Sequence, residues 1–357
     1  MRNLGSIMLT KEENRVFNIQ DWIDGKTVLE TFPVEFTIGV TRRCNYSCRM
    51  CYRHQYNARH NRKELDKVVF DKLQPYLEYA STCRWHCDGE IFSASHFDTI
   101  FELIRHCPAE INGFSTNGYE LINHVDAIVN SNISLINVSL DAATETTYAA
   151  IRKAGGAFGR VLDGIRQVID HRRNNKPVIE LMFVVMAPNI GEMDDFVRLA
   201  ADIKADRVFF QRFNPNVVVK DLRNWSVSKQ DEAMAFGKAK ALGEKLKIGI
   251  RHTCEDELND LLGVVEDVIR CSLPWRGLLV EVDGSVKCCC FQKKSLGNLN
   301  DHTFEEIWNG KDFQALRKAV HEENYRAFCL PDCPHVPKEQ HGTGNYLQKL
   351  KNALISR

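Results

Sequence analysis

Residues 34–51 read VEFTIGVTRRCNYSCRMC. The first seven residues predict a strand, and the loop that follows carries Cys44, Cys48 and Cys51. Three thiolates hold three irons of a cubane [4Fe–4S] cluster and leave the fourth iron open to another ligand. This stretch therefore predicts a fold that begins with a strand and a metal centre at the end of that strand.

Three other interpretations of the cysteine loop compete with an open cluster: buried apolar cysteines, a zinc site, and a closed cluster completed by a distant ligand. Zinc sites commonly use two paired-cysteine knuckles, and no second pair lies nearby in the sequence. The chain has 13 cysteines. Clustered cysteines in a reducing compartment indicate metal or redox chemistry, because disulfides are rare there. Zinc is the main alternative.

Composition sets the class of protein. The 357 residues are 44% hydrophobic and 26% charged, with 47 basic and 47 acidic side chains. This is an ordinary globular composition. A net charge of zero argues against general binding to nucleic acid or to an anionic membrane. The sequence has no apolar run of about 18 residues and no signal-peptide pattern, so we expect a cytoplasmic protein without membrane partners.

Strand and helix patterns alternate beyond the cysteine loop. A helix over 95–105, capped by Ser95, is one of the connecting helices. Such alternation predicts a parallel sheet with right-handed crossovers. Six units are too few for a closed eight-unit barrel, so we predict an α/β fold with a partial (β/α)6 barrel, whose functional residues lie at the C-terminal strand ends. The six predicted strands cover 34–40, 82–87, 110–115, 133–140, 178–186 and 207–212.

The pattern changes after residue 213. Helices are predicted at 228–247 and 255–269, and a hairpin at 277–290 turns at Asp283-Gly284. A helix at 303–322 begins with a capping box of Thr303 and Glu306. We predict five segments: an N-terminal extension (1–33), the partial barrel (34–225), a helical linker (226–265), a small α+β domain (266–337) and a basic tail (338–357).

The motif CxxxCxxC after the first strand of a six-unit partial barrel resembles the radical S-adenosylmethionine (SAM) enzymes. Asp88-Gly89-Glu90, after the second strand, is similar to the GGE motif of that family, with Asp88 in place of the first glycine. The resemblance covers roughly residues 34–212. It implies a [4Fe–4S] cluster that binds SAM and is held by Cys44, Cys48 and Cys51.

The same resemblance implies which residues contact SAM. Relatives use a polar residue such as Ser139 for the ribose and an arginine such as Arg152 for the methionine carboxylate. Asp141 has an alternative role as N-cap of the helix that begins near Thr144. Met50 replaces the aromatic residue that usually leans on adenine. The cofactor-binding candidates are Met50, Tyr52, Asp88, Gly89, Glu90, Ser115, Ser139, Asp141, Arg152 and Met186.

A second cysteine group follows in the C-terminal part and resembles the auxiliary-cluster region called SPASM, or its shortened form, twitch. It has fewer cysteines than a full SPASM region, which favours one auxiliary [4Fe–4S] cluster. Consecutive strand residues face opposite sides, so the run 288–290 cannot bind one cluster together, and family spacing selects Cys289. A structural zinc site is the alternative. The implied ligands are Cys271, Cys289, Cys329 and Cys333.

The resemblance implies cleavage of SAM to a 5′-deoxyadenosyl radical and hydrogen abstraction from a C–H bond. We predict a small sugar-like or aminocyclitol-like substrate that undergoes dehydrogenation or epimerisation, because the segment before the first strand is short for a leader-binding domain. A peptide-modifying maturase is the alternative, and a non-catalytic iron–sulfur or zinc protein is the second alternative. Cys254 is a candidate hydrogen donor for epimerisation. The implied electron donor is a flavodoxin or a ferredoxin.

Overall fold

The computed structural model describes residues 9–55, 64–86, 88–215, 220–253, 271–330 and 333. One ten-stranded sheet runs through these residues in the order β10-β9-β8-β1-β2-β3-β4-β5-β6-β7. Strands β1 to β7 are parallel to their neighbours, which confirms the predicted partial barrel. They are β1 (Glu35–Gly39), β2 (Thr82–His86), β3 (Ile111–Thr116), β4 (Leu135–Ser139), β5 (Val178–Val185), β6 (Arg207–Arg212) and β7 (Gly249–His252).

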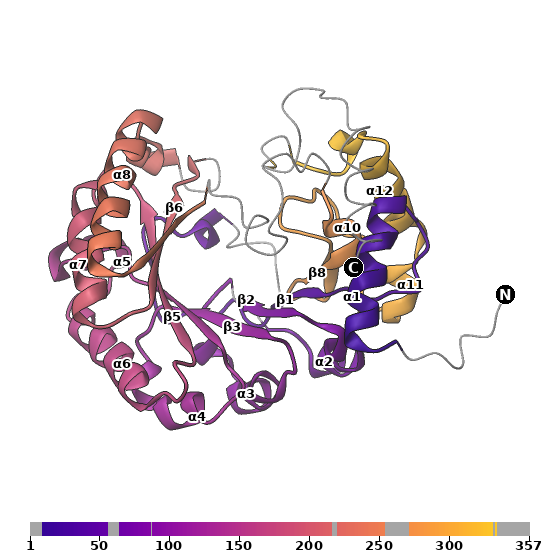
Figure 1. Cartoon of the computed structure of the whole chain (residues 1–357), viewed down its shortest axis with the longest axis horizontal. Coiled ribbons are helices and arrows are strands. Elements are labelled where there is room, and N and C mark those ends of the chain that lie inside the picture. Colours follow the sequence, from indigo (N-terminus) through magenta and orange to yellow (C-terminus); the bar gives the residue numbers. More distant parts are fainter. Residues whose placement is uncertain are drawn as a thin grey trace.

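Helices cover the outer face of the curved sheet (Figure 1). Alternation along β5 and β6 explains why, because Phe183 and Phe210 are fully buried and Phe183 packs against Phe196 of α7. The rings of Phe183 and Phe196 stand 4.8 Å apart, and Phe183 and Phe210 are 5.5 Å apart. The barrel helices are α2 (Lys67–Leu73), α3 (Phe97–His106), α4 (Val125–Val129), α5 (Glu145–Arg152), α6 (Phe158–His171), α7 (Met193–Asp202) and α8 (Lys229–Leu246).

Short 3₁₀ helices connect several of these elements. One of them, η1, begins directly after the third cysteine of the N-terminal cysteine loop. They are η1 (Tyr52–Gln55), η2 (Gln74–Tyr79), η3 (Ile91–Ser93), η4 (Leu121–Asn123), η5 (Ile190–Glu192), η7 (Lys220–Trp225) and η8 (Tyr325–Ala327).

Strand β7 extends the barrel beyond the six predicted units. Its sequence, Gly-Ile-Arg-His, carries one apolar side chain, so it has no strand periodicity to detect. The strand is held by its neighbours, because its Arg251 and the Arg207 of β6 both pair with the buried Glu180 of β5, at 3.2 and 2.6 Å. Tertiary contacts, not local sequence, therefore define this strand.

The C-terminal cysteine-bearing part continues the same sheet. Strand β8 (Gly277–Val280) pairs in parallel with β1, and β9 (Ser285–Lys287) pairs antiparallel with β8, which confirms the predicted hairpin. Strand β10 (Gly297–Asn298) closes the edge. One expectation is wrong: β9 ends at Lys287, so residues 288–290 lie in a bend and turn rather than in a strand.

The N-terminal segment packs against this C-terminal part. Helix α1 (Lys11–Asp24) contacts α10 (Leu273–Arg276), and the Asn18 side-chain amide donates to the Trp275 carbonyl at 2.6 Å. The Trp308 indole donates to the Thr31 carbonyl at 2.8 Å. Figure 1 shows α1 beside α10, α11 and α12, at the end of the sheet away from α8.

Two helix predictions need correction. The helix expected over 303–322 is two helices, α11 (Phe304–Trp308) and α12 (Lys311–His321), although the Thr303 capping box is present. Asn309 stands at the break, where its side chain bonds the backbone of Leu29 at 2.9 and 2.8 Å. Ser95 does not cap α3: its hydroxyl donates to Glu64, and His96 occupies the N-cap position.

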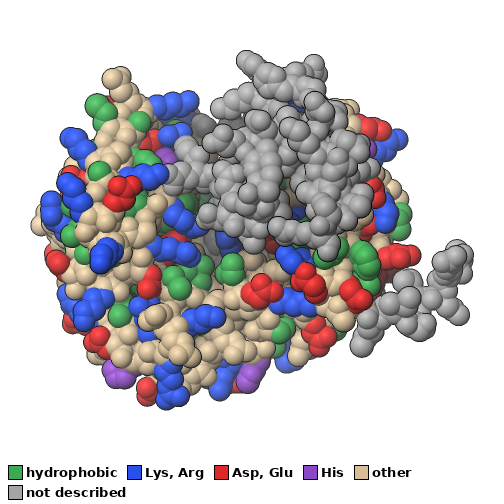
Figure 2. All heavy atoms as spheres, viewed as in Figure 1, with side chains coloured by type: hydrophobic (Ala, Val, Ile, Leu, Met, Phe, Trp, Pro, Cys, Tyr) green, Lys and Arg blue, Asp and Glu red, His purple; other side chains and the backbone are tan. Residues whose placement is uncertain are grey.

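Surface charge is mixed on the face drawn in Figure 2, where Lys and Arg side chains stand among Asp and Glu side chains over its described part. In the described part of the chain, no helix is both long enough and apolar enough to cross a bilayer. The expected helix at 255–269 and the tail at 338–357 lie outside the described residues.

The Trp308 anchor gives a first test. Trp308 is 1% exposed and packs against Phe313 and Arg317, so Trp308→Ala should lower the free energy of unfolding by about 3–5 kcal/mol. Urea unfolding of the purified chain measures this loss. Phe17→Ala on α1 is the control, because Phe17 is 49% exposed and its loss should cost less than about 0.5 kcal/mol. Equal effects of the two changes would contradict the packing described.

Candidate functional site

The three cysteines of the N-terminal loop lie directly beyond the C-terminal end of β1. Cys48 is buried, and Cys44 and Cys51 are half-buried. The Cys51 amide donates to the Cys48 carbonyl at 3.2 Å, which turns the loop between them. Burial raises the pKa of Cys44 and of Cys51, and the nearby Cys48 adds to both shifts. Cys48 is therefore close enough to Cys44 and to Cys51 to affect their ionisation. Bound cationic iron would stabilise all three as thiolates.

The part of the chain that the structure describes contains no three His, Cys, Asp or Glu side chains that could share a single metal ion. A cubane cluster makes a different demand, because each of its thiolates binds a separate iron.

The Asp-Gly-Glu motif at the end of β2 packs against this loop. A Cβ atom on Gly89 would stand 1.9 Å from the Arg43 carbonyl oxygen, so only glycine fits there. The Glu90 amide donates to the same carbonyl at 2.7 Å. The Glu90 carboxylate is buried and accepts from the Thr116 hydroxyl and the Asn117 amide, both at 2.6 Å. The motif thus fixes the cysteine loop to β2 and β3.

Asp141 does not cap a helix, so that alternative is wrong. Thr144 is the N-cap of α5 and accepts from the Thr147 amide at 3.3 Å. Asp141 is instead fully buried at φ 60°, and its carboxylate accepts from the Val184 amide at 2.7 Å. Its other carboxylate oxygen lies 2.6 Å from Nη2 of Arg152. The loop after β4 therefore turns a carboxylate inward, toward α5.

Arg152 joins this carboxylate to the cysteine loop. Its Nη1 donates to the Cys48 sulfur at 3.6 Å, and its Nε has no partner among the described residues although the side chain is 8% exposed. Burial opposes the charge on Arg152, but Asp141 and Cys48 outweigh that effect and raise its pKa. A fixed cation consequently lies beside the predicted cluster, with one N–H free for a further acceptor.

An apolar wall flanks the same site. Met186 is fully buried in a cluster with Ile151, Phe213 and Leu222, and Met50 and Trp225 pack against that cluster. The guanidinium of Arg49 lies 4.8 Å from the centre of the Trp225 ring. Sequence reasoning missed Trp225, because it ends η7, a short 3₁₀ helix after β6 that carries no apolar periodicity.

Two predicted serines share one face of the sheet. Ser115 of β3 is in register with Asn137, and Ser139 lies two residues further along β4. Both are half-buried, whereas the alternating Phe114 and Val138 are buried on the opposite face. The structure therefore places Ser115 and Ser139 at the carboxyl ends of adjacent strands, where ligands bind in such folds.

The C-terminal cysteines come together from three segments. Cys271 precedes α10, and Cys289 follows β9. The backbone of Cys329 pairs with that of Gln292 in an isolated antiparallel β-bridge. Burial and the neighbouring Cys289 raise the pKa of Cys271, and a hydrogen bond with Cys333 raises that of Cys329. The four predicted ligands of the auxiliary cluster are thus close enough to affect one another's ionisation.

The three consecutive cysteines at 288–290 differ in their exposure to solvent. Cys288 is buried and Cys290 is exposed. The Cys288 thiol is hydrogen-bonded to Cys289, which lowers the pKa of Cys289 and favours its thiolate. Cys289 stays the predicted ligand. Cys254, the candidate hydrogen donor, lies outside the described residues.

Comparisons with known proteins match both parts of the chain. A family model described as the radical SAM superfamily matches residues 38–200, and one described as the SPASM iron–sulfur cluster-binding domain matches residues 271–334. A probable GTP 3′,8-cyclase of Methanocella arvoryzae is 29% identical over 36% of this chain and 41% of its own length.

A second curated relative aligns over more of the chain. The antilisterial bacteriocin subtilosin biosynthesis protein AlbA of Bacillus subtilis is 20% identical over 85% of this chain and 65% of its own length. The alignments therefore span less than two thirds of either curated relative. The crystal structure of Streptococcus suis SuiB bound to precursor peptide SuiA superposes with a TM-score of 0.65 at 11% identity, covering 89% of this chain and 74% of that chain. This likeness shows a shared fold.

Glu90 gives a pH-dependent test. Burial raises its pKa from 4.5 to about 7 against the opposing hydrogen bonds of Asn117 and Thr116. The folded state therefore keeps a proton that the unfolded state loses, so this contribution to stability is complete below about pH 4.5 and is lost as the pH rises through about 7. We expect the free energy of unfolding, measured from pH 5 to pH 8, to fall more for wild type than for Glu90→Gln. Parallel curves would contradict this expectation.

Proposed function

Since this chain belongs to the radical SAM superfamily and carries a C-terminal SPASM domain, we propose that it cleaves SAM reductively and that the 5′-deoxyadenosyl radical abstracts hydrogen from a C–H bond of an organic substrate. The observation that carries this proposal is the loop of Cys44, Cys48 and Cys51 at the C-terminal end of β1, beside the buried pair Asp141–Arg152. A binding module has no need for that combination.

The family match implies a [4Fe–4S] cluster with SAM, and the SPASM match implies auxiliary iron–sulfur binding. The donor chemistry fits both groups, because thiolate sulfur is the usual ligand of such clusters. Cys44, Cys48 and Cys51 would hold the first cluster. Four thiols in the C-terminal group match the number of ligands of one auxiliary cluster. They are Cys271, Cys289, Cys329 and Cys333.

The neighbouring residues supply orientation. Asp141 holds the guanidinium of Arg152 in place, and the partnerless Nε of Arg152 is suited to a carboxylate. Met50 and Trp225, which pack against the buried cluster around Met186, would offer thioether and aromatic surface to a flat ring and exclude water. These residues would fix the SAM carboxylate and adenine and so hold the reacting carbon against the substrate.

A peptide substrate has the stronger support of the two substrate classes. The relative that aligns across both parts of the chain takes part in bacteriocin biosynthesis, and the SuiB structure holds a precursor peptide. The GTP cyclase alignment covers only 36% of this chain. The competing prediction, a sugar-like or aminocyclitol-like substrate, rests on the short segment before β1. That segment forms α1, which packs against α10.

The activity is tested by anaerobic reconstitution with iron and sulfide, reduction with dithionite and assay of 5′-deoxyadenosine after SAM is added. We expect wild type to form product and the Cys44/Cys48/Cys51→Ala variant to form none while it keeps its auxiliary iron. Asp301→Gly, at an exposed turn, is a surface control and should form product at the wild-type rate. Purification of wild type with zinc in place of iron, and without product, would overturn the proposal.

The substrate class is tested by deuterium transfer. Extracts of the cells that make the protein, grown in deuterated medium, are separated into a peptide fraction and a small-molecule fraction. We expect deuterated 5′-deoxyadenosine with the peptide fraction. Deuterium transfer from the small-molecule fraction alone would favour the sugar or aminocyclitol alternative instead.

A further inference from the structure

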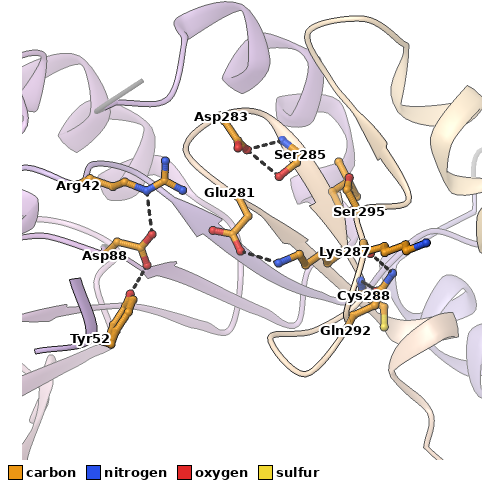
Figure 3. A network of polar contacts seen from close by, with 12 residues as sticks. Arg42, Tyr52, Asp88, Glu281, Asp283, Ser285, Lys287, Cys288, Gln292 and Ser295 are labelled. Carbon is orange, nitrogen blue, oxygen red and sulfur yellow. Dashed lines mark hydrogen bonds and ion pairs between the residues drawn. The ribbon is translucent and has the colours of Figure 1, made fainter. Parts of the chain in front are cut away.

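The carboxylate of Asp88 binds residues on both sides of the three-cysteine loop. One oxygen accepts from Nε of Arg42 at 3.2 Å, and the other accepts from the hydroxyl of Tyr52. Arg42 stands two residues before Cys44, and Tyr52 directly follows Cys51. Figure 3 shows the three side chains converging, with Asp88 between the other two. We call Arg42, Asp88 and Tyr52 the clasp.

The clasp is shielded from water. The side chains of Arg42 and Asp88 are 19% and 18% exposed. The hydroxyl of Tyr52 is a hydrogen-bond donor, and it donates to the Asp88 carboxylate. Hydrogen bonds to an ionised carboxylate are stronger than neutral ones, and limited exposure reduces screening by solvent and salt. The hydrogen bonds of the clasp are therefore stronger than those of a fully exposed ion pair.

The clasp is absent from the motif that this chain otherwise resembles. A glycine at the first position of the GGE motif has no side chain and cannot join the two ends of the loop. Gly89 and Glu90 reach only the N-terminal end of the loop, through the Arg43 carbonyl. Asp88 adds contacts with Arg42 and with Tyr52, so it joins the two ends of segment 42–52.

We propose that Asp88 is a positioning residue that closes the cysteine loop at both ends and slows the loss of the cluster held by Cys44, Cys48 and Cys51. This inference rests on the proposed function, because it assumes a cluster on that loop. Free loops lose conformational entropy when they bind a metal group. A loop that is already closed loses less, and outer residues that position metal ligands commonly change metal affinity by about 10- to 100-fold.

The test installs the glycine of the family motif. Asp88→Gly and wild type are reconstituted, and iron release to a ferrous chelator is followed under argon by absorbance. We expect the N-terminal cluster of Asp88→Gly to lose iron about 10-fold faster than that of wild type. The Cys44/Cys48/Cys51→Ala variant gives the release rate of the auxiliary cluster alone, which should be unchanged in Asp88→Gly. Equal release from the N-terminal cluster of wild type and Asp88→Gly would overturn the proposal.

A milder variant guards against misfolding. Tyr52→Phe removes one hydroxyl and should speed release in the wild-type background, but should add nothing in the Asp88→Gly background, because the clasp is then already open. Additive effects of the two changes would contradict the clasp. Asp301→Gly makes the same chemical change at an exposed turn and should leave release unchanged.

The two proposals fail in different ways. A wild type that retains iron on the loop and releases it faster after Asp88→Gly, but forms no 5′-deoxyadenosine, supports the clasp and refutes the proposed function. A wild type that forms 5′-deoxyadenosine and shows no change in iron release after Asp88→Gly refutes the clasp alone.

Discussion

Parallel pairing of β1 on both of its sides organises the molecule. β1 pairs with β2 along Glu35–Gly39 and with β8 along Glu35–Ile38. Its C-terminal end delivers the first cysteine loop, and the hairpin that starts at β8 delivers part of the second cysteine group. Both cysteine groups are therefore connected through one strand in one continuous sheet. The barrel and the SPASM part share backbone hydrogen bonds, and side chains add to this contact, as where Arg276 pairs with Glu35 at 2.9 Å.

Buried ionisable groups lie beside the first cysteine loop. Asp141 and Arg152 form an ion pair beside Cys48, and Glu90 is buried under the same loop. Buried charges are costly unless they are paired and hydrogen-bonded. In the loop after β4, the Asp141 carboxylate offsets part of that cost by accepting a hydrogen bond from the Val184 amide. These buried groups lie beside the three thiols. Such an arrangement suits a site for an anionic cluster and a zwitterionic ligand, although it costs stability.

The barrel and the first cysteine loop could be predicted from sequence, because apolar alternation and local cysteine spacing are encoded within a few residues. β7 could not, since its order comes from pairing with β6 and from the shared Glu180. The break at Asn309 follows from bonds to Leu29, which is distant in the sequence. The role of Asp141 was also hidden, because a helix cap and a buried counter-ion have the same local sequence.

The cysteine choice near β9 shows a related limit. Alternation in a strand was the basis for separating residues 288–290, yet the strand ends before them. The backbone amide of Cys288 donates to the Gln292 side chain at 2.8 Å, and Gln292 pairs with the backbone of Cys329. The number of thiols can be read from the local sequence. Their positions depend on backbone contacts between distant segments, such as Gln292 with Cys329.

In the proposed function, one of two iron–sulfur centres carries SAM and the other does not. Electron paramagnetic resonance of the dithionite-reduced wild type, recorded with and without SAM, tests it most directly. We predict two overlapping cluster signals, of which SAM shifts one, and the Cys44/Cys48/Cys51→Ala variant should lack the shifted signal and keep the other. A wild-type spectrum that SAM leaves unchanged would contradict the account.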